Sequence, residues 1–163
     1  ATAGEGTEQV TVDDATAFLA RFIPGTRVAP GAYATIEATR LAPGHKNFNS
    51  WEINGSEGSL RFCFERMNEL EYCSRADPAD MSGFRTILCT EGTHPYFGAW
   101  WPPGHVIGYE HAFVHTVADF INAVATSTEV HADFLDGARC VAVLESVVKS
   151  CQAKGWTKVA ELS

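Results

Sequence analysis

Hydrophobic and polar residues alternate along much of the first ninety positions, which is the pattern of half-buried β-strands. The segments that we interpret as strands are residues 9–12, 16–22, 33–41, 48–54, 59–64, 70–73 and 84–90, with a last short strand at 156–162. Residues 15–22 alone would also fit a helix, because periodicity cannot decide so short a run. Asn54, Gly55 and Gly58 between two of these segments predict a hairpin turn, because Asn and Gly tolerate positive φ.

The hydrophobic period changes to that of a helix after residue 109. In residues 109–125 the apolar side chains fall on one helical face, formed by Phe113, Val117, Phe120, Ile121 and Val124. A second amphipathic segment covers residues 137–154, with Asp136 as its expected N-cap and Gly155 as its stop. Strands followed by helices predict an α+β fold with an open, largely antiparallel sheet of about six strands, covered on one face by two helices.

Length, composition and charge narrow the class of protein. The 163 residues are enough for a single domain, which we expect to span residues 1–163. The net charge of −8 disfavours nucleic acid as a partner, and the sequence contains no apolar run long enough to span a membrane. Five scattered cysteines without a C-x-x-C spacing favour reduced thiols. Because residues 1–9 also lack the features of a signal peptide, we expect a cytoplasmic protein.

Residues 94–115 hold the most informative chemistry of the chain. Four of the six histidines lie there, together with Tyr96, Trp100, Trp101 and the Pro102–Pro103 pair. Aromatic rings can stack on the C–H faces of a sugar or polyol, while their polar tips and imidazoles hydrogen-bond hydroxyl groups. The same residues could instead form an oligomer contact or simply close the end of the sheet.

Two further groups of polar residues are candidates for binding. His111, His115 and Asp119 share one face of the first predicted helix, where they could form a solvated surface, contact a substrate or bind a metal ion. Lys46 and Asn49 follow a Pro-Gly turn and could bind hydroxyls or a phosphate, or form a solvated turn. No Ser or Cys has a recognisable base partner, and so a nucleophilic mechanism has no support.

Several segments of the chain resemble the Gfo/Idh/MocA family of oxidoreductases, in order and spacing. They are VDDATAFLARF at 12–22, TIEATR at 35–40, WEINGSEGSL at 51–60, FERMNEL at 64–70, GFRTIL at 83–88, HPY at 94–96, WWPPGH at 100–105 and GYEH at 108–111. Members of this family have an N-terminal Rossmann domain for NAD or NADP and a C-terminal α/β domain that binds substrate and builds the oligomer. The resemblance is to the C-terminal domain alone, because the glycine-rich nucleotide motif and the Glu-Lys-Pro segment that carries the family's catalytic lysine are absent.

The resemblance implies the C-terminal substrate-binding and oligomerisation domain of an NAD(P)-dependent sugar or polyol oxidoreductase, as a fragment or a truncated homologue that is inactive alone. The alternative is a stand-alone binding or assembly module without catalysis. We expect no cofactor and no metal in this chain, a homo-oligomer through the open sheet face, and a Rossmann domain supplied in cis or in trans. The expected substrate-side surface is a shallow groove with millimolar affinity, formed by Lys46, Asn49, His94, Tyr96, Trp101, His105 and His111.

Overall fold

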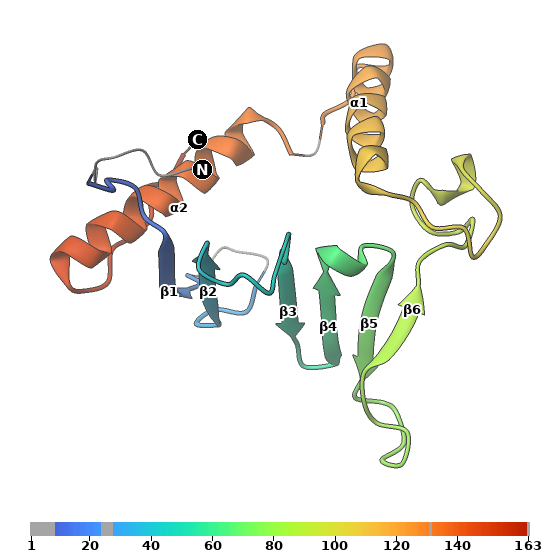
Figure 1. The fold of residues 1–163 in the computed structure, drawn as a ribbon, viewed down its shortest axis with the longest axis horizontal. Helices are drawn as coiled ribbons and strands as arrows, with labels where there is room; N and C mark the ends of the chain where they lie inside the picture. Colours follow the sequence, from blue (N-terminus) through green and yellow to red (C-terminus); the bar gives the residue numbers. More distant parts are fainter. Residues whose placement is uncertain (1–8, 24–27, 131, 163) are drawn as a thin grey trace, which may run out of the picture. The chain divides into compact units, whose positions relative to one another are not determined.

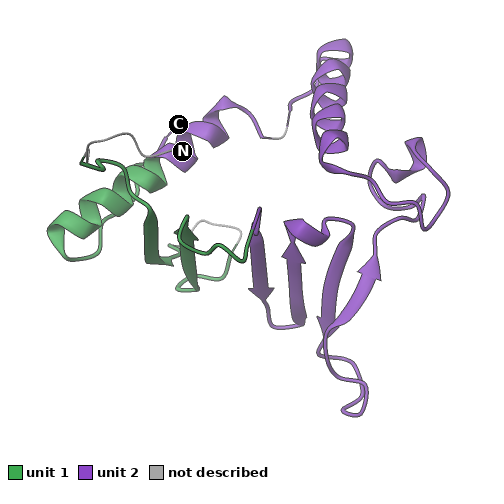
Figure 2. Ribbon diagram, viewed as in Figure 1, with its two compact units in different colours: residues 1–45, 142–160 green, residues 46–141, 161–163 purple. Residues whose placement is uncertain are grey.

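A computed structural model describes residues 9–23, 28–130 and 132–162. The signal-peptide expectation rests almost entirely on residues 1–8, which lie outside this part. The chain forms two compact units, residues 1–45 with 142–160 and residues 46–141 with 161–163 (Figure 2). Their boundary falls within the last helix, and each unit is described by itself. The expectation of a single domain over residues 1–163 stays a prediction.

The first unit contains a β-hairpin and most of helix α2 (Phe134–Ala153). Strands β1 (Ala15–Arg21) and β2 (Tyr33–Thr39) pair antiparallel, so the segment that could have been a helix is a strand (Figure 1). Phe18 lies opposite Ile36 on the more buried face of this hairpin. Along one side of α2, Ala142 and Ser146 are buried.

The second unit contains a four-stranded antiparallel sheet in the order β3-β4-β5-β6. Its strands are β3 (Ser50–Asn54), β4 (Gly58–Cys63), β5 (Glu69–Ser74) and β6 (Arg85–Leu88). The predicted turn joins β3 to β4, with a hydrogen bond of 2.9 Å from the Gly55 N–H to the Gly58 carbonyl. Gly58 has no room for a side chain, because a Cβ there would lie 2.3 Å from the carbonyl oxygen of Cys73.

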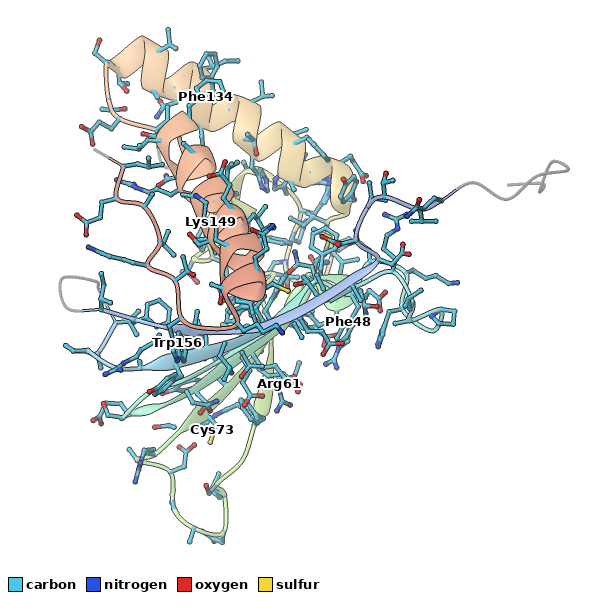
Figure 3. All side chains as sticks on the ribbon, turned by 90° about the vertical axis from the view of Figure 1, so that its left-hand side faces the viewer. Phe48, Arg61, Cys73, Phe134, Lys149 and Trp156 are labelled. Atoms are coloured by element: carbon cyan, nitrogen blue, oxygen red, sulfur yellow. The ribbon has the colours of Figure 1, made fainter. Side chains whose placement is uncertain are left out.

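The two faces of this sheet differ in chemistry. Trp51 lies opposite Phe62, and their rings stack with centroids 5.6 Å apart on the apolar face. The other face carries an ion pair of 2.7 Å between Glu52 and Arg61, and Arg61 lies opposite Glu71 on the next strand. Arg61 and Cys73, both on this charged face, are labelled in Figure 3.

Besides the first residues of α2, the second unit contains two short 3-10 helices and one long helix in its described residues. They are η1 (Phe64–Arg66), η2 (Phe97–Ala99) and α1 (Tyr109–Thr126). The predicted α+β class is confirmed, with its open antiparallel strands and two helices, and the strands divide into a two-stranded and a four-stranded sheet. None of the helices in the described residues is long and apolar enough to cross a bilayer.

Both of the expected terminal strands are absent from the described residues. The last hydrogen bond of the first hairpin runs from the Arg40 N–H to the Asp14 carbonyl, at 2.8 Å. Beyond it the Leu41 N–H donates a hydrogen bond to the Thr39 hydroxyl, so β2 does not continue as a strand. Residues 9–12 therefore have no strand to pair with. The prediction for residues 156–162 is also wrong, because this segment pairs with no strand of the described chain.

The ends of α2 also differ from the prediction. Asp133, and not Asp136, precedes the first helical residue, and its carboxylate accepts the Asp136 N–H at 2.9 Å. The Asp136 carboxylate accepts the Asp133 N–H in return, so the two residues form a reciprocal capping box. At the other end, the left-handed residue is Lys154, with φ of 52°, and the Gly155 N–H bonds the Ser150 carbonyl at 3.2 Å.

Candidate functional site

An aromatic segment, residues 89–108, connects β6 to α1, and side-chain hydrogen bonds from Thr90 and Asn68 anchor it. Thr90, which is 2% exposed, accepts a hydrogen bond of 3.0 Å from the Gly104 N–H. Asn68 bonds both backbone groups of Ile107, donating to its carbonyl at 2.8 Å and accepting from its N–H at 3.0 Å. Sequence reasoning missed these two anchors, because Thr90 lies outside the recognised segments and Asn68, within the segment at 64–70, lies far from Ile107 along the chain.

Tyr96 is held by two residues one turn apart on α1. Its ring stacks on the His115 imidazole, with centroids 4.3 Å apart and planes inclined by 12°. Its hydroxyl donates a hydrogen bond of 2.7 Å to Asp119 Oδ2. The same residue has a φ of 66°, a left-handed conformation that is uncommon for a bulky side chain.

Electrostatics at this contact act on the Tyr96 phenol. The hydrogen bond that it donates to Asp119, with a smaller contribution from desolvation, raises the pKa of Tyr96 above its ordinary value of 10.0. A phenolate would lose the donated hydrogen bond and place a second negative charge beside the Asp119 carboxylate. The contact therefore belongs to the neutral form of the phenol.

Trp100 packs between the two histidines of α1. Its indole Nε1–H donates a hydrogen bond of 2.7 Å to His115 Nε2. Its ring also meets the His111 ring edge-on, with centroids 4.5 Å apart. His115 therefore contacts both Tyr96 and Trp100, although neither contact follows from helical spacing.

The hydrogen bonds of the imidazoles define which ring nitrogen carries a proton in the neutral form. Nδ1 accepts a backbone N–H in His94, from Glu91 at 2.9 Å, and in His111, from Gly108 at 3.1 Å. In His105, Nδ1 lies 2.9 Å from the Pro102 carbonyl, which can only accept. His94 and His111 therefore present an Nε2–H donor, whereas His105 presents Nε2 as an acceptor.

Glu110 is a second neighbour of His111. Its carboxylate lies 3.5 Å from the same Nδ1, but its side chain is 77% exposed, so the shorter backbone hydrogen bond sets the tautomer. Within the described residues, Nε2 of His94, His105 and His111 has no hydrogen-bond partner. Together these atoms offer two donors and one acceptor, a set that suits hydroxyl groups.

The remaining predicted site residues lie in two places. Trp101 directly follows Trp100 and is 59% exposed. Lys46 and Asn49 lie on the segment that enters β3, where the N–H groups of Lys46 and Asn47 both donate to Glu65 Oε1 at 2.8 Å. The Asn49 carbonyl accepts a hydrogen bond of 2.8 Å from the N–H of Phe64, the first residue of η1. The Phe64 ring in turn meets the ring of Tyr109 at the start of α1.

The polar face of α1 is thus a packing surface for the aromatic segment. His115 and Asp119 were candidates for a metal site. His115 instead accepts a hydrogen bond from Trp100, and Asp119 accepts one from Tyr96. Among the described residues, no three His, Cys, Asp or Glu side chains are placed to hold a metal ion together.

Two cavities lie away from the predicted site residues. One of about 1020 Å³, in the first unit, is lined by β1, α2 and residues 154–159. The other, of about 330 Å³, lies beside the β3–β4 turn. The predicted site residues line neither of these two cavities.

Comparison with known proteins shows what this chain is similar to. No family model matches the sequence. The chain matches the C-terminal part of oxidoreductases of the Gfo/Idh/MocA type, which confirms the resemblance of its motifs. Levoglucosan dehydrogenase of Pseudarthrobacter phenanthrenivorans is 37% identical over 162 residues, which are 98% of this chain and 40% of that protein.

Solved structures show the same relationship. An oxidoreductase domain protein from Kribbella flavida is 45% identical, with a TM-score of 0.86 over 94% of this chain and 40% of its own. Levoglucosan dehydrogenase in complex with NADH and levoglucosan is 36% identical, with a TM-score of 0.86 over 95% of this chain and 41% of its own. The chain therefore spans about two fifths of the length of the relatives that it matches.

Proposed function

We propose that this chain is the C-terminal, substrate-binding part of an NAD-dependent sugar or polyol dehydrogenase. The observation that carries the proposal is the similarity, over 98% of the chain, to levoglucosan dehydrogenase, whose structure was solved with NADH and levoglucosan. The aromatic segment supports a sugar or polyol as the ligand, because exposed Trp101 offers a ring face. The free imidazole nitrogens offer donors and an acceptor for hydroxyl groups.

The nucleotide would be held outside these residues. All strand pairs of the described chain are antiparallel, whereas a dinucleotide site of the Rossmann type needs a parallel βαβ unit with a glycine-rich turn. The residues present therefore do not fit NAD, and we derive no hydride-transfer step through them. Catalysis in our proposal requires a further domain, in cis or in trans, and the isolated chain is inactive.

Self-association is the second element of the proposal. Trp51 and Ile53 on the edge strand β3 are 42% and 58% exposed, and apolar surface of this kind favours burial between subunits. We expect a homo-oligomer through the open sheet, in a cytoplasmic setting where the five thiols stay reduced. Sedimentation that shows only a 17.7 kDa species at high concentration would contradict the oligomer.

The binding site itself is tested by NMR titration of the 163-residue chain with levoglucosan and L-sorbose. Millimolar affinity is expected, because an open surface buries little of a small ligand. Chemical-shift changes should cluster at Trp101, His105 and His111. Changes confined to residues 137–154, or the absence of any change at high sugar concentration, would overturn the proposed site.

A further inference from the structure

We propose that His115 and Asp119 are positioning residues that hold the turn at residues 96–100 in one conformation, so that Trp101 is presented to a sugar. The inference deepens the proposed function and rests on it for the identity of the ligand. Neither residue belongs to the predicted site surface. Their side chains act on Tyr96 and Trp100, the first and last residues of the turn.

The first argument is the backbone conformation of Tyr96. Its φ of 66° is unfavourable for a residue with a large side chain, and such a conformation persists only where the surroundings hold it. The contacts that hold Tyr96 in this conformation come from α1: the stacked ring of His115 and the hydrogen bond to Asp119. Without them, Tyr96 is expected to relax towards a negative φ and change the course of the turn.

The second argument is that His115 acts on both ends of the turn. One face of its ring stacks on Tyr96, while its Nε2 accepts the indole N–H of Trp100 at 2.7 Å. Asp119 lies one helical turn further along α1 and holds the tip of the Tyr96 side chain. His115 and Asp119 thus hold the turn through three contacts, two on Tyr96 and one on Trp100.

The third argument is what the turn displays. Trp101 follows Trp100 directly in the chain, is 59% exposed, and has no ring or hydrogen-bond contact within the described residues. Its placement depends on the backbone of Trp100, because its own side chain makes none of these contacts. A backbone already held in place at Trp101 loses less conformational entropy when a ligand binds, so the three-point attachment should strengthen binding.

The test compares two variants at His115 that separate its contacts. His115→Phe keeps a flat ring for Tyr96 and removes the acceptor of the Trp100 indole. His115→Gln removes the ring and restores an acceptor, because Gln Oε1 lies the same number of bonds from Cβ as His Nε2. Asp119→Ala removes the acceptor of the Tyr96 hydroxyl, and Asn122→Ala, an exposed residue on the same helix, is the matched control.

The first readout is hydrogen exchange at the Trp100 indole, measured by NMR on the 163-residue chain without sugar. The indole N–H should exchange slowly in the wild type and in Asn122→Ala, fast in His115→Phe, and at an intermediate rate in His115→Gln. Backbone relaxation at Trp101 should show increased motion in His115→Phe and Asp119→Ala. Equal exchange and equal order in all variants would overturn the positioning role, whether or not a sugar binds.

The second readout is the affinity for levoglucosan. His115→Phe and Asp119→Ala should each weaken binding roughly two- to tenfold, the range expected for one lost hydrogen bond, while His115→Gln recovers part of the loss. Equal affinity in all variants would overturn the link between the turn and the ligand. A wild-type chain that binds no sugar would instead contradict the proposed function, and the exchange and relaxation data would still decide the positioning role.

Discussion

Four histidines with similar surroundings in the sequence play different roles in the structure. His115 accepts a hydrogen bond from Trp100 and stacks on Tyr96. The other three, His94, His105 and His111, each bond a nearby backbone group through Nδ1 and keep Nε2 available. His111 also completes the N-terminus of α1 by accepting the Gly108 N–H, a role usually taken by Glu or Gln. A single histidine can therefore both cap a helix and offer a donor to a ligand.

The Tyr96–Asp119 contact makes the phenol titrate abnormally. Because the folded pKa is raised, the contact contributes to stability below the ordinary pKa of 10.0 and is lost as the pH rises through the raised value. A pH titration of the Tyr96 ring signals by NMR should show a midpoint above the ordinary one. In Asp119→Ala the midpoint should fall towards the ordinary value, and a midpoint unchanged by this substitution would refute the assigned cause.

Residue types and periodicity could indicate candidate site residues, but not how their side chains pair. The pairing of Trp100 with His115 depends on a left-handed Tyr96, and no local pattern predicts such a conformation for tyrosine. The anchors Thr90 and Asn68 were missed for a related reason. Their partners are backbone groups of an irregular loop, whose position is set by the tertiary structure.

At the scale of elements, alternation and turn chemistry predicted the strands that have neighbours. The segment at 59–64 became β4 (Gly58–Cys63), and the helical period at 109–125 became α1 (Tyr109–Thr126). The segments at 9–12 and 156–162 failed because an alternating pattern becomes a strand only where another strand can complete its hydrogen bonds. The misplaced cap of α2 arose because Asp133 and Asp136 are both suitable cap residues.

The corrected cap of α2 makes a testable prediction. Asp133→Ala removes the acceptor of the Asp136 N–H and should lower the free energy of unfolding by about 1 kcal/mol, the usual cost of losing an N-cap. Asp133→Asn keeps a side-chain oxygen in place and should change stability much less. Denaturant unfolding followed by circular dichroism measures both, and an Asp133→Ala chain as stable as the wild type would contradict the assignment.

At the scale of the whole molecule, much apolar surface is left exposed. Phe113, Phe120 and Val124 on α1 are 57%, 60% and 66% exposed, and Phe134 at the start of α2 is 99% exposed. Phe134 is labelled in Figure 3. In our proposal, the further domain and the oligomer would cover apolar surface of this kind. In the relatives, the matching part is about two fifths of the chain.

The absence of a parallel sheet in the described residues leads to a prediction about the cofactor. Calorimetric titration of the 163-residue chain with NADH should detect no binding of micromolar or greater affinity. Levoglucosan titrated in the same way should bind in the millimolar range. Tight NADH binding would show that these residues hold the nucleotide by another route and would refute the division of roles between domains.

The central claim is that residues 94–111 form the sugar-binding surface, and two exposed tryptophans allow it to be tested directly. Trp101 lies on this surface and Trp156 follows α2, with exposed fractions of 59% and 68%. Levoglucosan affinity should be measured by NMR for the wild type, Trp101→Ala and Trp156→Ala. The account predicts that Trp101→Ala weakens binding about tenfold, as the loss of a stacking ring would, and that Trp156→Ala binds like the wild type. Unchanged affinity in Trp101→Ala, or a loss found only in Trp156→Ala, would contradict it.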